Sequence, residues 1–456
     1  MNRSNKSTRM IAFEILEMIE KEKDITASEL LSNLANKYRL KRRDRALIKE
    51  LVFGVLRNRL LLDYIIEKHI KHKKPIQPPL QQILRIGAYQ LLLLDRIPAH
   101  AAVNEAALCA RTLFNKGAAG FVNAILRKIS ALTLEDIPLP DEKRDLTCFL
   151  SVQYSHPKWI VEILLEQFGV EKTREILAFN NKPAPLTLRV NITKISREQL
   201  IEWLQTTEPG ADIKPGKISP QSIHIKNFPL KPSWTPLEKG WVYIQDEGAQ
   251  LVSLVAHPRE KMRIVDFCSA PGGKITHMAE MVSQNAELIA LDISEVRLKK
   301  VGNNSKRLGL TKIRIAKITP GILEELSQKP AHLVLADVPC SGLGIIRRQP
   351  DIKWKKTKKE IKALPRLQLN ILEQASRLVA PDGILIYSTC TLADIENSGV
   401  VNTFLKKHPE FEKGKIELSG SLADAPFITP EGFLLTLPPR DLTDGFFCAK
   451  LVKKYR

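Results

Sequence analysis

The sequence of 456 residues has no long apolar run, few cysteines and a shortage of acidic residues. No apolar stretch approaches the roughly 20 residues that a membrane-spanning helix needs. The first residues, MNRSNKSTRM, are basic, but no apolar signal core follows them, so we predict no secretion signal. We therefore expect a cytoplasmic protein that does not associate with a membrane.

The six cysteines are too few for a disulfide framework, and no two of them form a C-x-x-C pair. Without such pairs we expect no metal, despite the nine histidines. The thiols should be reduced, and most should be buried structural residues, so a functional role for any one needs a specific argument.

The shortage of acid leaves a large positive charge, with 70 Lys and Arg against 50 Asp and Glu, or +20. Such a surplus favours a polyanionic partner, either nucleic acid or an anionic membrane surface. Residues 1–130 carry 24 basic and 12 acidic residues, and residues 345–366 carry nine basic and two acidic residues. These two segments hold 19 of the 20 net charges, so we expect RNA or DNA to contact them.

The apolar pattern predicts a multidomain chain, as its length also suggests. Residues 1–130 read as an all-α helical bundle, with helices over Ile11–Ile19, Ala46–Leu56, Leu80–Leu94 and Ala101–Leu113. Residues 131–147 are acidic and contain proline, as in a linker. Residues 148–240 read as a small α+β subdomain, with a helix from Pro157, strands at Leu186–Ile192 and Ser222–Ile225, and a helix at Arg197–Leu204.

Residues 241–456 alternate strands with helices, which predicts an α/β domain with an open, mostly parallel sheet. We expect strands at Ile264–Phe267, Glu287–Leu291, Ile313–Ala316, Ala331–Ala336, Gly383–Tyr387, Thr436–Pro439 and Phe446–Val452. We expect helices at Lys274–Met281, Glu295–Leu308, Gly321–Leu326, Lys359–Val379 and Ile395–Lys406. Ligands bind beyond the carboxyl ends of the strands in such sheets.

The turn after the first of these strands has glycines that allow a ligand to approach, at the start of a helix. It is not a P-loop, because Cys268 stands where that motif has its first glycine, and it is not G-x-G-x-x-G. The next strand ends in Asp292, which is placed to accept hydrogen bonds from a ribose diol. Without phosphate-binding signals these features favour S-adenosylmethionine over NAD or ATP, although a plain turn and a helix cap at Asp292 remain alternatives.

Cys340 and Cys390 follow two further strands, and Asp337 precedes the first of them by three residues. Carbon 5 of a pyrimidine is a weak nucleophile, but a thiolate that adds at carbon 6 makes it reactive, and the thiol can leave afterwards. Asp337 could hydrogen-bond the base. Two buried structural thiols or a redox pair remain alternatives.

A basic segment, IIRRQPDIKWKKTKKEIKALPR, follows the first cysteine motif directly. Trp354 lies among its lysines and predicts a stacking surface beside charges that bind phosphate. A solvated lysine-rich helix start at Lys355–Lys359 is the alternative interpretation.

Together these motifs resemble the Nop2/Sun (Fmu) family of 5-methylcytosine RNA methyltransferases. The residues that carry the resemblance are CSAPGGK at Cys268–Lys274, DVPCSG at Asp337–Gly342, RRQPDIKW at Arg347–Trp354, STC at Ser388–Cys390 and the run Thr443–Phe447. The first helices resemble the NusB-type domain, in Leu84–Leu91 and Gly120–Arg127. The resemblance implies a NusB-like RNA-binding domain, a small RNA-recognition subdomain and a class I (Rossmann-like) methyltransferase domain.

The resemblance also implies roles for single residues. Cys390 would be the nucleophile, and Cys340 would assist release of the methylated product. Asp292 would hold the ribose of S-adenosylmethionine, and Asp337 would lie near its sulfonium and the base. The methionine part would be enclosed by Cys268, Ser269, Ala270, Pro271, Gly272, Gly273 and Lys274.

One position departs from the family pattern, because Ile318 stands where an acidic residue usually contacts the adenine. Either the backbone holds the adenine or cofactor affinity is reduced. We expect a monomer that methylates a cytosine in small-subunit (16S) ribosomal RNA. The same chemistry on transfer RNA, or a non-catalytic RNA-binding factor on this scaffold, are the alternatives.

Overall fold

The computed structural model describes residues 6–22, 24–70, 75–228, 233–282, 286–418, 422 and 426–455. The chain forms two compact units, one of Met1–Lys182 with Ile346–Lys356 and one of Pro183–Ile345 with Thr357–Arg456. The domain boundaries expected from the sequence stay predictions. The basic cluster Lys71–Lys74 lies outside the described residues. No helix among those residues is both long and apolar enough to cross a membrane.

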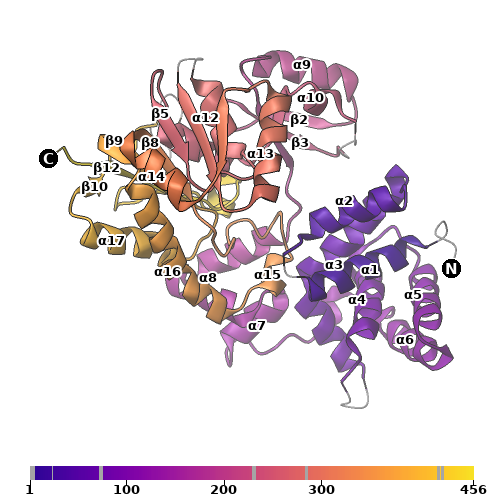
Figure 1. Cartoon of the computed structure of the whole chain (residues 1–456). Coiled ribbons are helices and arrows are strands. Elements are labelled where there is room, and N and C mark those ends of the chain that lie inside the picture. Colours follow the sequence, from indigo (N-terminus) through magenta and orange to yellow (C-terminus); the bar gives the residue numbers. More distant parts are fainter. Residues whose placement is uncertain are drawn as a thin grey trace. The chain divides into compact units, whose positions relative to one another are not determined.

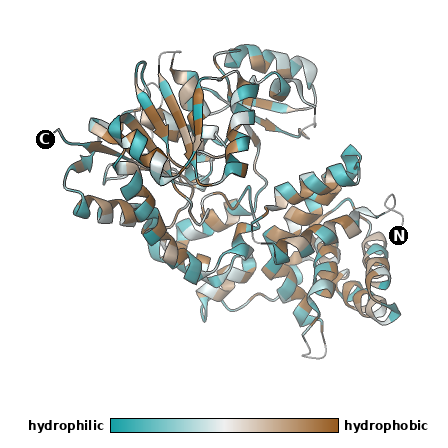
Figure 2. Ribbon diagram, in the orientation of Figure 1, coloured by the Kyte–Doolittle hydropathy of each residue, from teal (hydrophilic) through white to brown (hydrophobic). Residues whose placement is uncertain are grey.

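The first unit is helical, as predicted (Figure 1). Its helices carry both hydrophobic and hydrophilic residues, as the colours of Figure 2 show, and the buried apolar side chains form one core. Thr26 and Glu29 form a capping box that supplies partners for free N–H groups at a helix start. Its helices are α1 Thr8–Lys21, α2 Ala27–Lys37, α3 Arg42–Lys68, α4 Pro78–Leu93, α5 Ala99–Leu113, α6 Lys116–Ile129, the 3-10 turn η1 Leu134–Asp136, α7 Leu146–Gln153 and α8 Lys158–Asn180. These bounds contain or closely match the predicted helices.

Residues 346–356 also belong to this unit, although they lie more than 160 positions further along the chain. They include the short helix α15 (Ile352–Lys355), which Figure 1 shows among the earlier helices. The indole N–H of Trp354 donates to the carbonyl oxygen of Leu56 (2.8 Å), and its ring packs against the helical core. The guanidinium of Arg347 donates to the Lys182 carbonyl (3.2 Å). Part of the predicted basic segment is therefore packed into the helical unit, and the prediction that Trp354 stacks on a nucleic acid stays a prediction.

Lys353 holds this segment in place from inside the unit. Its side chain is buried, with 1 % of the residue exposed. The ammonium donates to the carbonyl oxygens of Arg57 (2.8 Å) and Ser155 (2.7 Å) and approaches the Asn181 side-chain oxygen (3.4 Å). Burial lowers its pKa well below the ordinary value. This lysine therefore donates its hydrogen bonds to groups within the protein.

The second unit begins with an antiparallel sheet in the order β2-β3-β1-β4. Its strands are β1 Leu186–Val190, β2 Asp212–Pro215, β3 Ser222–Lys226 and β4 Val242–Ile244, and its helices are α9 Arg197–Thr207 and α10 Thr235–Glu238. A separate apolar core underlies this sheet. The predicted strands and helix of this region are confirmed, apart from the last two residues of the first strand.

The larger sheet has the order β10-β12-β9-β8-β5-β6-β7, with β11 paired to β12. The strands β5 to β9 are parallel, and β10 to β12 pair antiparallel. The strands are β5 Arg263–Asp266, β6 Glu287–Asp292, β7 Ile313–Lys317, β8 Ala331–Asp337, β9 Val379–Thr389, β10 Phe411–Lys413, β11 Leu434–Leu435 and β12 Phe447–Lys453.

Helices flank this sheet, and apolar clusters lie on both of its faces. They are α11 Glu247–Ala256, α12 Gly273–Met281, α13 Glu295–Leu308, α14 Pro320–Gln328, α16 Lys358–Ser376, the 3-10 turn η2 Asp394–Glu396, α17 Ser398–Lys407 and α18 Pro438–Asp441. The α/β prediction is confirmed, with two corrections. The helix predicted to end at Val379 ends at Ser376, because Val379 is already paired in β9. Thr436–Pro439 is not a strand, since two prolines start a short helix there.

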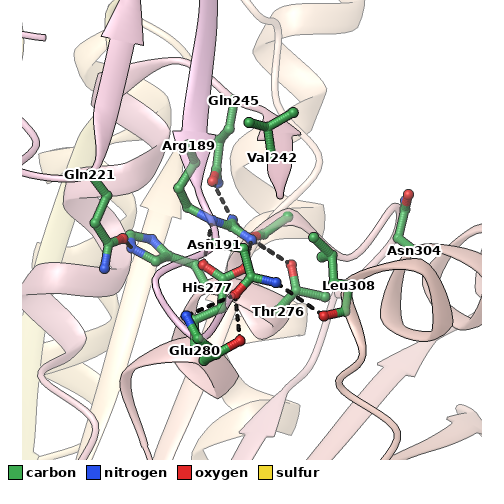
Figure 3. Close-up of polar contacts among 12 residues, drawn as sticks. Arg189, Asn191, Gln221, Val242, Gln245, Thr276, His277, Glu280, Asn304 and Leu308 are labelled. Carbon is green, nitrogen blue, oxygen red and sulfur yellow. Dashed lines mark hydrogen bonds and ion pairs between the residues drawn. The ribbon is translucent and has the colours of Figure 1, made fainter. Parts of the chain in front are cut away.

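A buried ion pair joins the small sheet to helix α12 of the larger α/β fold (Figure 3). Arg189 on β1 and Glu280 on α12 are both fully buried, and they form two charge-assisted hydrogen bonds (3.0 and 2.7 Å). The guanidinium also donates to the side-chain oxygen of Gln245, the carbonyl of Gly273 and the hydroxyl of Thr276. These contacts fix the first turn of α12 against the small sheet.

We expect Arg189→Met to lower the free energy of unfolding by about 3–5 kcal/mol, because Glu280 would remain buried without its partner. The double variant Arg189→Met with Glu280→Leu should recover most of that loss. Equilibrium unfolding in urea measures both. As a control, Arg314→Met removes an exposed pair with Glu325 and should change stability by less than about 1 kcal/mol. Equal losses for Arg189 and Arg314 would contradict the argument.

Candidate active site

The turn between β5 and α12 contains the glycine-rich run identified in the sequence. Gly272 adopts a φ of 101°, a left-handed conformation that L side chains rarely take. Its carbonyl oxygen accepts a hydrogen bond from the Thr276 hydroxyl (2.6 Å), and its N–H donates to Ser269 (2.7 Å). Cys268 is partly buried here, and burial raises the pKa of its thiol well above the ordinary value. Cys268 is therefore a protonated part of the turn.

Lys274, at the start of α12, faces Asp337 at the end of β8. The ammonium lies 2.5 Å from one Asp337 oxygen, and the hydroxyl of Ser388 donates to the other (2.7 Å). Burial lowers the pKa of Lys274, but the Asp337 carboxylate outweighs this effect and holds it above the ordinary value. The glycine-rich turn is thus tied to β8 and β9, the two strands that end just before Cys340 and Cys390.

Asp292 lies at the end of β6, buried beside the same turn. One oxygen accepts from the N–H of Ser294 (3.0 Å), and the other lies 3.4 Å from the N–H of Ala270. Arg297 donates to the Ala270 carbonyl (2.9 Å) and approaches Asp292 at 3.6 Å. The N-cap of α13 is Ser294, whose hydroxyl accepts from the N–H of Arg297 (3.4 Å), so Asp292 is not the helix cap that the sequence offered as an alternative. The second oxygen of Asp292 has only the long contact with Ala270 and the approach of Arg297.

Cys340 and Cys390 meet where β8 and β9 end. Their sulfur atoms are 3.2 Å apart, and the N–H of Cys390 donates to the Cys340 sulfur (3.3 Å). Both thiols are free. The contact with Cys390, together with burial, raises the pKa of Cys340 well above its ordinary value. The structure thus brings the two cysteines together with Asp337, whose strand carries the first of them.

Glu396, in the turn η2, holds the two cysteine loops together and was missed in the sequence. Its buried carboxylate accepts from the N–H of Ser341 (2.8 Å) and the side chain of Gln368 (2.9 Å). Burial raises its pKa, and the hydrogen bonds from Ser341 partly oppose that effect. The hydroxyl of Ser341 also bonds that of Thr391 (2.6 Å). Nothing in its sequence surroundings distinguishes Glu396 from other acids, because its partners come from distant segments.

Asp266 is a second residue that sequence reasoning missed. It ends β5 with 1 % of its surface exposed, and neither carboxylate oxygen makes a hydrogen bond with the described residues. Burial raises the pKa of this carboxyl to about 7, and the nearby Asp337 charge adds to the effect. A buried acid that lacks partners at a strand end is a sign of a ligand site. Its position before the glycine-rich turn could have singled it out.

Ile318 follows β7 and lies beside Asp292, because its N–H donates to the Asp292 carbonyl (3.0 Å). Ile293, directly after Asp292, is 72 % exposed. Apolar side chains therefore lie just beyond the carboxyl ends of β6 and β7, where an acid was expected from the family pattern. Within the described part of the chain, no group of His, Cys, Asp or Glu could hold a metal ion.

Comparison with known proteins gives matches along most of the chain. Residues 253–452 match the family described as 16S rRNA methyltransferase RsmB/F, and residues 6–131 match the NusB family. Residues 156–229 match the ferredoxin-like domain of RsmF/B-like methyltransferases.

Two relatives are similar over nearly their full length. A probable ribosomal RNA small subunit methyltransferase B of Bacillus subtilis is 33% identical, over 98% of this chain and 99% of the relative. Ribosomal RNA small subunit methyltransferase B of Klebsiella pneumoniae is 33% identical, over 99% of each. Among solved structures, PH0851 has a TM-score of 0.80 at 24% identity, over 98% of this chain and 99% of that one. At this sequence identity the structural similarity shows the fold alone.

We expect Gly344→Ala to disturb the cysteine loops, because an added Cβ would lie 2.0 Å from the Gly445 carbonyl oxygen and 2.9 Å from that of Cys390. Overpacking of this kind should lower the free energy of unfolding by about 1–3 kcal/mol. Urea unfolding, together with the rate at which a thiol reagent labels Cys390, measures the effect. Gly321→Ala, where nothing lies within 4 Å, is the matched control and should be neutral or stabilising. A neutral Gly344→Ala would contradict the close packing.

Proposed function

From the premise that this chain belongs to the RsmB/F family of ribosomal RNA small subunit methyltransferases, we propose that it methylates carbon 5 of a cytosine in 16S ribosomal RNA. It is an RNA methyltransferase, and S-adenosylmethionine is its cofactor. The observation that carries the cytosine assignment is the pair of sulfur atoms 3.2 Å apart beside Asp337. Two thiols in this position suit a reaction that forms and then breaks a bond from sulfur to a pyrimidine ring.

The residues at the strand ends fit the cofactor. The glycine-rich turn allows close approach of the methionine part, and Asp292 offers a carboxylate to the ribose. The unpartnered oxygens of Asp266 suit the positive charge of the sulfonium compound. When bound, S-adenosylmethionine supplies the methyl group that carbon 5 accepts. Cys268, Ser269, Ala270, Pro271, Gly272, Gly273, Lys274, Asp292 and Asp337 are the proposed binding residues.

We infer that Cys390 is the nucleophile. Its thiolate adds to carbon 6, and the electrons of the 5,6 double bond move to carbon 5, which becomes nucleophilic. The contact with Cys390 and burial raise the pKa of the Cys340 thiol well above its ordinary value, which makes Cys340 the less suitable nucleophile of the two. After methylation a base or solvent water takes the proton from carbon 5, the electrons of that C–H bond form the 5,6 double bond again, and the sulfur–carbon bond breaks to return the Cys390 thiolate. Cys340 assists that last stage.

Asp337 holds the base in this proposal. Its carboxylate already accepts from Lys274 and Ser388, which fix its orientation at the end of β8. A carboxylate can accept a hydrogen bond from the exocyclic amino group of cytosine, and uracil has no amino group to offer. This contact would favour cytosine over uracil.

The same proposal includes a cytoplasmic location and a monomeric state. It also includes the division of the chain into residues 1–130, 131–147, 148–240 and 241–456. The alternative of a non-catalytic RNA-binding factor draws on Ile318, where the apolar side chain offers no hydrogen bond to adenine. The same chemistry on transfer RNA has no observation in its favour.

We expect Cys390→Ala to abolish methyl transfer to 16S ribosomal RNA and Cys340→Ala to accumulate a covalent RNA–protein adduct. The first variant removes the nucleophile, and the second slows its release. Incorporation of labelled methyl groups and denaturing gels measure the two effects. The buried Cys109 serves as the matched control, and Cys109→Ala should leave both readouts unchanged. Substantial activity of Cys390→Ala would show that the assignment of the nucleophile is wrong.

The pKa of Asp266, about 7, predicts a pH-dependent cofactor affinity. A cationic ligand binds the ionised carboxylate better, so affinity should rise as the pH increases through 7, by roughly three- to tenfold between pH 6 and pH 8. Calorimetric titration with S-adenosylmethionine measures it, and Asp266→Asn should flatten the profile. If the wild-type protein gives no binding at any pH, the non-catalytic alternative gains over the enzyme.

A further inference from the structure

The first unit contains a cleft of about 570 Å³ that has no part in the chemistry above. It is bordered by α3, by α7 and the start of α8, and by α15 of the returning segment 346–356. Three aromatic side chains line it, namely Tyr64, Trp159 and Trp354, and all three are partly exposed. Figure 1 shows α15 between α3, α7 and α8. Its volume lies in the range of sites that hold a small organic molecule.

The walls combine these rings with cations. The guanidinium of Arg59 lies over the Trp354 ring at 5.0 Å, so a planar cation is already stacked on an aromatic face. Lys158 and Lys356 also line the cleft. Unpaired bases stack on aromatic rings and on guanidinium planes, and phosphates bind to lysine. This set of side chains therefore suits an unpaired nucleotide.

Two acidic side chains line the cleft, Asp63 and the exposed Glu67. Asp63 is engaged by Arg85, whose guanidinium donates to both of its oxygens (2.6 and 2.7 Å). Lys356 forms no ion pair with the residues that the structure describes, whereas Lys158 has an exposed partner in Asp145 at 3.3 Å. Lys356 is therefore the cation most available to a phosphate.

The segment that carries Trp354 and Lys356 is firmly held. Lys353 and Trp354 donate to carbonyl oxygens of α3 and of the α7–α8 turn, at 2.7–2.8 Å. The same segment begins at Ile346, six residues after Cys340. A nucleotide in the cleft would thus touch the stretch of chain that leads directly from the thiol loop.

We propose that this cleft binds one unpaired nucleotide of the ribosomal RNA, separate from the target cytosine, with its base on Trp159, Tyr64 or the Arg59–Trp354 stack and its phosphate on Lys356. The proposal rests on the function above, since it names a further contact of the same substrate. It keeps the stacking role that the sequence predicted for Trp354 and places that residue in a cleft of the helical unit.

The test uses the full-length protein and a 16S ribosomal RNA transcript that carries 4-thiouridine at random positions. After irradiation and digestion, mass spectrometry should find adducts on peptides that contain Tyr64, Trp159 or Trp354. On the unmodified transcript, Trp159→Ala should raise the dissociation constant about 5- to 100-fold, as expected for the loss of one stacked base. Trp159→Phe keeps a stacking ring and should stay within about threefold of the wild type.

A second variant reports on the phosphate and leaves the aromatic walls intact. Lys356→Gln should weaken binding several-fold and reduce the slope of log affinity against log salt by about 1. Lys415→Gln, at a lysine whose side chain is 84% exposed in the other unit, is the matched control and should change neither quantity. Circular dichroism of each variant checks that it folds.

The two proposals fail in different ways. If the wild type forms 5-methylcytosine but Trp159→Ala and Lys356→Gln bind RNA as it does, the cleft proposal is wrong and the function stands. Adducts confined to other peptides would overturn it as well. If the wild type forms no 5-methylcytosine while both variants lose RNA affinity, the cleft is supported as an RNA site and the function fails.

Discussion

The parallel pairing of β8 with β9 is the constraint on which the site depends. Its register sets Asp337 opposite Ser388, so the two strands end together and their next residues enter the same space. Cys340 and Cys390 lie only three and two residues further on, which is why two thiols separated by 50 positions meet at 3.2 Å. Parallel strands need a crossover, and α16 supplies it. The spacing of the cysteines in the sequence therefore means little without the register.

Buried charges then fix the pieces around this pair. Glu396 bridges the two cysteine loops, Arg189 ties the cofactor turn to the small sheet, and Lys353 holds the returning segment in the helical unit. Each is costly to bury unless its hydrogen bonds are made, so the neighbouring backbone must be placed where it can supply them. Such groups add little to the net free energy of folding, but they strongly destabilise backbone arrangements in which their hydrogen bonds are not made.

The positive charge that results from the shortage of acidic residues is not all available to a partner. Part of the positive charge in residues 345–366 is used inside the protein, where Lys353 meets carbonyl oxygens and Arg347 covers the Phe179 ring at 4.2 Å. Lys358, Lys359, Lys362 and Arg366 are exposed on α16 and remain candidates for contacts with phosphate. Net charge predicts a polyanionic partner, but it does not say which cations face that partner.

The sequence by itself determined the α/β class, most strand and helix positions, the glycine-rich turn and the two cysteine motifs, because periodicity and turn residues act over short distances. Only the tertiary structure decided the partners of Glu396, the unpartnered state of Asp266 and the inward position of Lys353. The first and last depend on hydrogen bonds between segments far apart in the chain, and the second depends on burial. No local pattern contains that information, since a buried and an exposed charged residue are written with the same letter.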